Sequence, residues 1–154
     1  MNSTQFPVIG WREYISLNDL KIPEMKVKVD TGAKTSSIHA KVIETYHRGS
    51  KEFILFEVEL STKENKTKKK KVARCRSEVV SYRKVKSSNG HVEKRPIIQT
   101  TISLKEQKWT IELNLTDRSE MGFPMLLGRD AIKKRFLVDS AKSFTSKKIG
   151  NKRK

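Results

Sequence analysis

The sequence feature that most limits what this chain can fold into is an alternating valine–lysine segment, residues 26–29, that runs directly into Asp30, Thr31 and Gly32. Alternation of apolar and charged residues predicts a strand with one buried face. Because Asp and Gly break strands, we expect the Asp30 carboxylate at a strand end, on a tight loop where Gly32 lets another backbone approach closely. A carboxylate held in this way can perform acid–base chemistry, although an ordinary surface turn is the alternative for these three residues alone.

A second distinctive segment lies far downstream, where the apolar residues 123–127 lead into Gly128, Arg129 and Asp130. The apolar run predicts another strand. Asp130 is expected to cap a short helix that continues to about Arg135, with basic residues near the negatively charged end of the helix. The occurrence of both segments in one chain is far more specific than either segment alone.

The remaining residues have the pattern of short strands separated by turns. Strands are predicted at 8–17, 25–29, 53–60, 92–104, 109–115, 123–127 and 136–139, and a strand or a pair of strands at 72–85. Residues 36–47 are ambiguous, but their β-branched content favours a hairpin with 53–60. Many short strands, turns at regular spacing and one short helix near the C-terminus predict a mainly β fold, closed or nearly closed into a β-barrel.

The chain carries a net charge of +17 over 154 residues, and much of this charge is concentrated in residues 63–71 and 142–154. Such basic blocks repel themselves and are usually solvated, mobile segments, yet they attract polyanions such as nucleic acid. The length suits one domain with a modest core. We therefore expect three parts: an N-terminal extension at 1–7, a folded domain at 8–141 and a basic tail at 142–154.

Several classes of protein are disfavoured by what the sequence lacks. No apolar run is long enough for a membrane span, and residues 1–5 lack the basic start and apolar core of a signal peptide, which predicts a cytoplasmic protein. The single cysteine, Cys75, excludes an internal disulfide and fits a reducing compartment. The histidines, His39, His47 and His91, lie in no metal-binding motif, and no phosphate-binding glycine loop is present, so the sequence predicts neither a metal site nor a cofactor.

Residues 10–13, 26–40 and 123–132 together resemble the retropepsin-like aspartic peptidases, and most closely a bacterial family labelled as ATP-dependent zinc proteases, whose members accompany ATP-grasp glutamate ligases. The resemblance spans roughly Gly10 to Asp139 and implies an acid-protease fold. It implies that Asp30 is catalytic, with site support from Thr31, Gly32, Ala33, Gly128, Arg129 and Asp130. Neither the zinc nor the ATP of the family label has a motif in this chain, so any ATP dependence would come from a partner ligase.

One Asp-Thr-Gly motif supplies only half of an aspartic-peptidase site. The mechanism needs two carboxylates that share a proton, one acting as base on a water molecule and the other as acid on the peptide carbonyl. Since the chain has one copy of the motif and no internal repeat, the resemblance predicts a twofold-symmetric homodimer in which Asp30 faces its symmetry mate. In such a dimer, Thr31 would lock the two loops together and Gly32 would offer backbone groups to the substrate.

Two features need comparison with the viral retropepsins. Lys34 stands where the viral enzymes have an aspartate that pairs with the helix arginine, and a reversed pair of Lys34 with Asp130 is the candidate substitute. Ser88, Asn89 and Gly90 are a strong turn signal in the part of the chain where a substrate-covering flap would lie, although a plain surface hairpin explains them equally well.

Two functions are therefore considered. The first is an aspartic endopeptidase that cleaves peptide bonds between the Asp30 carboxylates of a homodimer, and the positive charge and the ligase association suggest acidic or glutamate-tailed substrates. The alternative is a catalytically idle basic β-barrel that binds nucleic acid or the ribosome. The basic blocks are not interleaved with aromatic residues, which disfavours this alternative.

Overall fold

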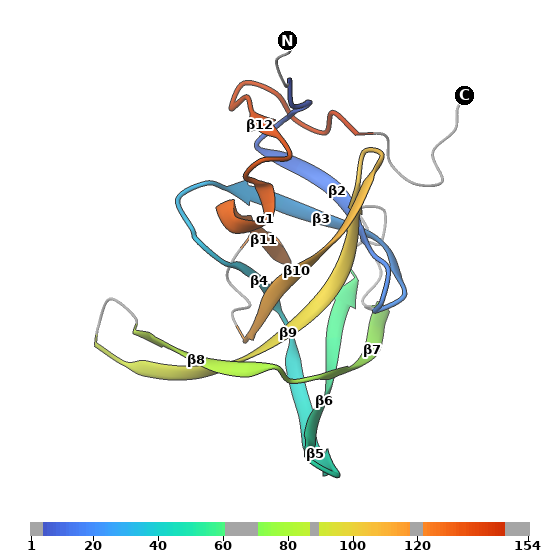
Figure 1. Ribbon diagram of the computed structural model, residues 1–154, viewed down its shortest axis with the longest axis vertical. Helices are drawn as coiled ribbons and strands as arrows, with labels where there is room; N and C mark the ends of the chain where they lie inside the picture. The colour runs from blue at the N-terminus through green and yellow to red at the C-terminus, as the bar shows by residue number, and fades with distance from the viewer. Residues whose placement is uncertain (1–4, 61–70, 87–89, 118–121, 147–154) are drawn as a thin grey trace.

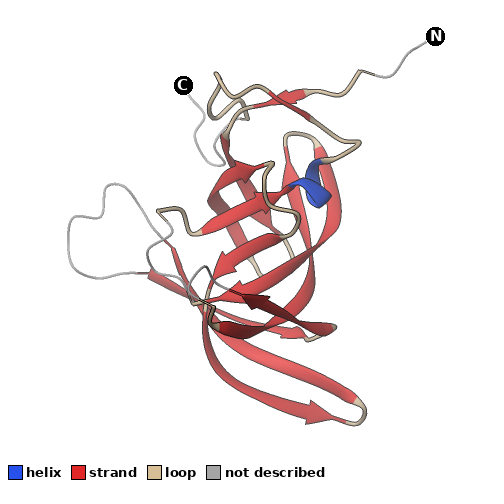
Figure 2. Cartoon of the chain, turned by 90° about the vertical axis from the view of Figure 1, so that its left-hand side faces the viewer, coloured by secondary structure: helices blue, strands red, loops and turns tan. Residues whose placement is uncertain are grey.

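The computed structural model describes residues 5–60, 71–86, 90–117 and 122–146, which form a mainly β fold, as the sequence predicts (Figure 1). The strands are β1 (Val8–Ile9), β2 (Arg12–Leu17), β3 (Ile22–Asp30), β4 (Ser36–His39), β5 (Lys41–Arg48), β6 (Lys51–Leu60), β7 (Lys71–Glu78), β8 (Ser81–Lys86), β9 (Val92–Leu104), β10 (Gln107–Thr116), β11 (Met125–Gly128) and β12 (Leu137–Val138). One helix, α1 (Arg129–Ile132), occurs among the described residues and is the blue element of Figure 2. No helix in this part of the chain is long and apolar enough to cross a membrane.

The largest sheet brings the two motif segments together. Its strand order is β10-β4-β11-β3-β2-β9-β8, and an additional pairing of β10 with β9 closes the strands from β10 to β9 into a ring. β11 lies parallel to β3, with Gly128 opposite Asp30 in the register. Two segments that are far apart in the sequence therefore end side by side.

Two smaller sheets complete the fold. β5, β6 and β7 form an antiparallel sheet, and the β5–β6 hairpin projects away from the rest of the molecule (Figure 2). β1 and β12 pair in parallel, which joins the two ends of the described chain. The sheet of β5, β6 and β7 lies away from the point where β3 and β11 end (Figure 1).

The alternation predicted for the strand before Asp30 is confirmed. Val27 and Val29 are buried, while Lys28 between them is exposed. β10 follows the same pattern and buries Trp109 and Ile111. Full burial of one large apolar side chain is worth roughly 1.5–3 kcal/mol. A slip of one residue would turn these side chains to solvent, so the alternation fixes the register of each strand.

The strand predicted at 8–17 is divided at Gly10. A Cβ atom at Gly10 would overlap the carbonyl oxygen of Lys142, so glycine is needed for these two segments to approach. The N–H of Trp11 donates to the same carbonyl oxygen at 2.9 Å. The sequence placed Lys142 at the start of a solvated tail, and the structure differs: the chain remains packed against β2 as far as Ser146.

The prediction that Asp130 caps the helix was wrong. The N-cap residue of α1 is Gly128, which has no side chain with which to cap the helix. Asp130 lies one residue inside α1, where its carboxylate pairs with Lys34. The helix ends at Ile132, earlier than expected, and Lys134 then takes a left-handed backbone conformation with φ of 66°.

A buried carboxylate fastens the C-terminal segment to β2. Glu13 has no exposed surface. Its carboxylate accepts hydrogen bonds of 2.6–3.1 Å from the backbone N–H groups of Gly10, Thr145 and Ser146 and from the side-chain hydroxyls of Thr145 and Ser146. Burial raises the pKa of Glu13, but the hydrogen bonds from Thr145, Gly10 and Ser146 outweigh this effect, and the pKa lies below its ordinary value. Glu13 is therefore held in its charged form.

Candidate active site

Asp30 is the last residue of β3 and begins a tight turn. The N–H of Gly32 donates to Asp30 Oδ1 at 3.1 Å, and the N–H of Ala33 donates to the Asp30 carbonyl oxygen at 3.1 Å. Asp30 is partly exposed, and Thr31 and Gly32 beside it are exposed. The loop therefore presents an oriented carboxylate at the surface, as expected for a group that meets a substrate or a second carboxylate.

The downstream motif, residues 128–130, packs against the loop that follows Asp30 and hydrogen-bonds to its backbone. The N–H of Arg129 donates to the carbonyl oxygen of Ala33 at 2.8 Å, and the N–H of Asp130 donates to that of Lys34 at 3.0 Å. The Arg129 guanidinium also lies 3.3 Å from the carbonyl oxygens of Thr31 and Gly32. Charge-assisted hydrogen bonds of this kind are stronger than neutral ones. The turn after Asp30 is thus fixed through its carbonyl groups by the start of α1.

Gly128 allows the backbones of the two motif segments to approach closely. A Cβ atom there would lie 2.7 Å from both the carbonyl carbon and the carbonyl oxygen of Thr35, and 3.0 Å from the Ala33 carbonyl oxygen. The buried N–H of Gly128 donates to the Ser36 hydroxyl at 3.0 Å. Ser36 was missed by sequence reasoning, because a serine in a strand gives no local signal of such a contact.

The reversed ion pair is present. Lys34 Nζ lies 2.8 Å from Asp130 Oδ2, and Lys133 Nζ lies 3.5 Å from Asp130 Oδ1. The hydrogen bond from Lys34 is the main reason that the pKa of the Asp130 carboxyl lies below its ordinary value. The pair links the loop after Asp30 to α1, and both partners are well exposed. It therefore positions the loop more than it stabilises the fold.

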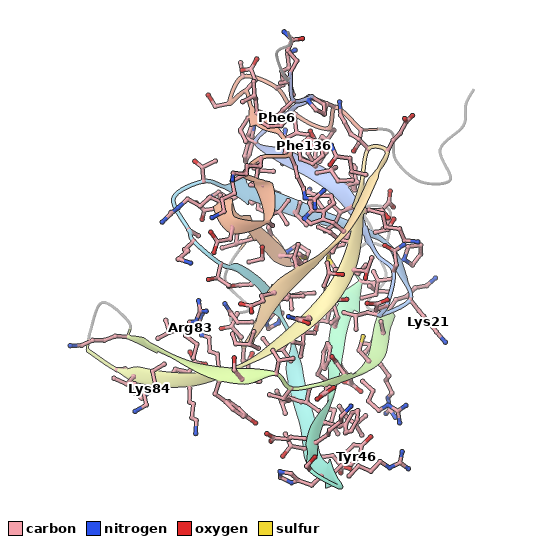
Figure 3. All side chains as sticks on the ribbon, viewed as in Figure 1. Phe6, Lys21, Tyr46, Arg83, Lys84 and Phe136 are labelled. Carbon is pink, nitrogen blue, oxygen red and sulfur yellow. The ribbon has the colours of Figure 1, made fainter. Side chains whose placement is uncertain are left out.

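The β8–β9 hairpin reaches the same loop through Arg83. Its guanidinium donates to Thr35 Oγ1 at 2.6 Å and lies 3.9 Å from a Glu112 carboxylate oxygen. Figure 3 shows Arg83 and Lys84 extending from opposite faces of β8. Of the predicted flap residues, Gly90 has a left-handed φ of 87°, whereas Ser88 and Asn89 lie outside the described residues. Sequence reasoning located the hairpin but missed Arg83.

The remaining candidate ligands are dispersed. Among the described residues, no group of three or more His, Cys, Asp or Glu side chains is arranged to hold a metal ion. Cys75 is buried, and burial raises the pKa of its thiol to about 11, so this group is protonated at neutral pH and is a poor nucleophile. The chemistry that the described site offers is that of one oriented carboxylate for each chain.

The fold and this loop define a class of protein. An Asp-Thr-Gly turn at the end of one strand, held by a parallel strand that ends in Gly-Arg-Asp at a short helix, is the arrangement of the retropepsin-like aspartic peptidases. A family model described as "Retropepsin-like aspartic endopeptidase RimB" matches residues 8–149. The chain belongs to this RimB-like family, which confirms the resemblance found in the sequence.

Relatives and a solved structure agree with this assignment. A "Probable alpha-L-glutamate ligase" of Desulfotalea psychrophila is 43% identical over 134 residues, which make up 87% of this chain and 28% of the relative. A protein of the same name from Shewanella halifaxensis is 40% identical over 144 residues, 94% of this chain and 30% of the relative. The chain thus spans under a third of the length of these relatives.

The crystal structure of a Legionella pneumophila protein of unknown function (DUF785) matches with a TM-score of 0.73 at 33% identity. The match covers 93% of this chain and 100% of the other. The similarity therefore extends over the whole fold and is not confined to the region of the motifs.

Proposed function

We propose that the protein is an aspartic endopeptidase whose catalytic pair consists of Asp30 from two copies of the chain. The observation that carries this proposal is the Asp30 turn: its carboxylate is oriented by the Gly32 N–H and exposed, while Arg129 holds the surrounding carbonyl groups. The family to which the chain belongs is described as an aspartic endopeptidase family. One such carboxylate for each chain makes a homodimer necessary for the chemistry.

The proposed mechanism follows from the behaviour of two close carboxyl groups. Because two negative charges about 3 Å apart repel each other, the pair holds one proton at working pH. The ionised Asp30 removes a proton from a water molecule, whose oxygen attacks the carbonyl carbon of the scissile bond, while the protonated Asp30 of the other copy donates its proton to the carbonyl oxygen. The C–N bond of the resulting tetrahedral diol then breaks, and the Asp30 pair returns a proton to the leaving nitrogen. The two pKa values belong to the pair and not to either residue.

We propose acidic or glutamate-tailed peptides as substrates. Lys34 follows the Asp30 turn and Arg83 contacts the same loop from the β8–β9 hairpin, so two cationic side chains lie beside the loop that carries Asp30. The overall charge of +17 would attract an acidic chain from solution. The names of the relatives support a functional link to a glutamate ligase, an enzyme class that produces glutamate-containing peptides.

The decisive experiment compares wild type, Asp30→Asn and Asp117→Asn on a glutamate-rich peptide and on a glutamine-rich peptide of the same length, with products identified by mass spectrometry. Asp117 is an exposed aspartate at the end of β10 and provides the matched control. We expect cleavage of the glutamate peptide by wild type and Asp117→Asn, and a loss of about a thousandfold or more in Asp30→Asn. In parallel, light scattering over a concentration series measures the molar mass in solution and so tests whether the chain forms a dimer.

Undiminished cleavage by Asp30→Asn would overturn the assignment of the catalytic residue. A chain that is monomeric at every concentration and cleaves neither peptide, yet binds RNA with a steep dependence on salt, would instead favour the nucleic-acid-binding alternative.

A further inference from the structure

One edge of β10 is only partly covered. β9 pairs with β10 from Gln107 to Asn114, whereas β4 pairs with the opposite edge only from Leu113 to Thr116. On the β4 side, the strand edge ahead of Leu113 therefore has no strand partner among the described residues. Uncovered edges carry backbone groups that can pair with an added strand.

The backbone groups of Thr110 point toward this uncovered edge. Thr110 lies opposite Thr101 of β9, but the Thr101 N–H donates to Asp19 Oδ2 at 3.0 Å and its carbonyl oxygen accepts from the Asn18 N–H at 2.9 Å. Thr101 thus directs its backbone away from β10. In an antiparallel pair of this kind, the partner residue also directs its N–H and C=O away, so those of Thr110 face the β4 side.

A cavity of about 550 Å³ lies beside this edge. Residues 109–112 of β10 line one side, and Asp130, Ala131 and residues 133–135 line the other. Thr35 and Ser36 also line it, so the cavity opens next to the end of the catalytic loop. The space adjoins outward-pointing backbone groups on one side and the catalytic loop on the other.

The charges around the cavity favour an anionic occupant. Both acidic side chains that line it are already engaged: Asp130 by Lys34 and Lys133, and Glu112 by Arg83. Lys134 and Arg135 also line the cavity and contribute positive charge that no carboxylate within ion-pair distance offsets among the described residues. The Arg135 guanidinium is held over the Trp109 ring, 4.7 Å from its centroid.

We infer that this cavity is an exosite that binds an extended acidic peptide as an added strand along β10. The peptide backbone pairs with Thr110, and its acidic side chains meet Lys134 and Arg135. A chain bound there passes Thr35 and is directed toward Asp30. The inference rests on the proposed function only in taking this peptide to be part of a substrate, since binding at β10 requires no cleavage.

The test uses a fluorescein-labelled peptide of about ten glutamates and fluorescence anisotropy at low salt, with the whole 154-residue chain. Thr110→Pro removes the outward N–H, a group that does not hydrogen-bond to β9, and Thr110→Ala retains this N–H while removing the same side chain. We expect Thr110→Pro to weaken binding about five- to tenfold relative to Thr110→Ala. Lys134→Glu should weaken peptide binding more than Lys84→Glu, which reverses a charge on β8 and serves as the control.

Equal affinities of the Pro and Ala variants, with both folded by circular dichroism, would overturn the proposal. In case Thr110→Pro fails to fold, amide hydrogen exchange of the wild-type chain gives the second measurement. Peptide should slow exchange of the Thr110 N–H, and an unchanged rate with peptide bound would likewise exclude pairing at this edge. Neither measurement depends on cleavage, so the exosite and the peptidase activity can fail separately.

Discussion

Replacement of Glu13 by glutamine tests whether the buried carboxylate holds the C-terminal segment in place. The substitution preserves the size of the side chain but exchanges one acceptor oxygen for an NH₂ donor and removes the charge. Oε2 accepts from Gly10 and Thr145, and Oε1 accepts from Ser146. Whichever oxygen becomes nitrogen, at least one backbone N–H loses its acceptor and faces a second donor.

The expected loss of stability follows from these contacts. A buried donor left without its acceptor costs roughly 1–3 kcal/mol, and the remaining bonds lose charge assistance worth on the order of 1 kcal/mol. We therefore expect Glu13→Gln to lower the free energy of unfolding by about 2–4 kcal/mol, measured by urea unfolding at neutral pH. Glu44→Gln, at an exposed position of β5, is the control and should remain within about 0.5 kcal/mol of wild type.

The pH dependence provides an independent check. Because the pKa of Glu13 is lowered in the folded state, its charged form stabilises the fold above the ordinary glutamate pKa of about 4.3. This contribution is lost as the pH falls through the folded-state pKa. The difference between wild type and Glu13→Gln should therefore be largest near neutral pH and shrink below about pH 4. A loss under about 0.5 kcal/mol, or a difference independent of pH, would refute the reasoning.

Two further predictions concern the loop that follows Asp30, residues 31–35. Gly128→Ala places a methyl group against the Thr35 backbone, so it should lower the free energy of unfolding by about 1–3 kcal/mol and reduce peptidase activity. Gly49→Ala, at a position in open space with a left-handed backbone, is the control and should lower the free energy of unfolding by only about 1 kcal/mol while preserving activity. Equal effects of the two substitutions would argue against the proposed packing. Lys34→Asp should reduce the rate of peptide cleavage, and the double variant Lys34→Asp, Asp130→Lys should recover part of the lost activity. No recovery in the same assay would mean that Lys34 acts on the substrate and not through Asp130.

The sequence predicted those parts of the site that are encoded by local pattern. Alternation of valine and lysine located β3, and strand-breaking residues placed Asp30 at its end. The pair of Lys34 with Asp130 was predicted because Lys34 stands where the viral retropepsins have an aspartate, and a change in the sign of a charge can be read directly from a sequence. The mainly β fold likewise followed from the number and spacing of short alternating segments.

Contacts between distant polar residues were not predictable in the same way. Arg83 reaches Thr35 because β8 continues from the ring of strands beside β9, and only the sheet topology brings these residues together. Lys142 was assigned to a solvated tail on its basic composition. The structure holds this region through a buried carboxylate, Glu13, and a backbone approach at Gly10, neither of which changes the local hydrophobic pattern.

Several contacts within the chain shape the loop that follows Asp30: Arg129 and Asp130 bind its carbonyl groups, Ser36 binds Gly128 beneath it, and Arg83 contacts it from the β8–β9 hairpin. These contacts form when the chain folds, so folding already bears part of the entropy cost of ordering this loop. On the proposed function, a second copy then needs to supply only its own preformed Asp30 turn. The stability of the site and the formation of the dimer can then be tested separately. Substitutions that loosen the loop should reduce the activity of each dimer. Substitutions at the contact between the two copies should reduce only the number of dimers at a given concentration.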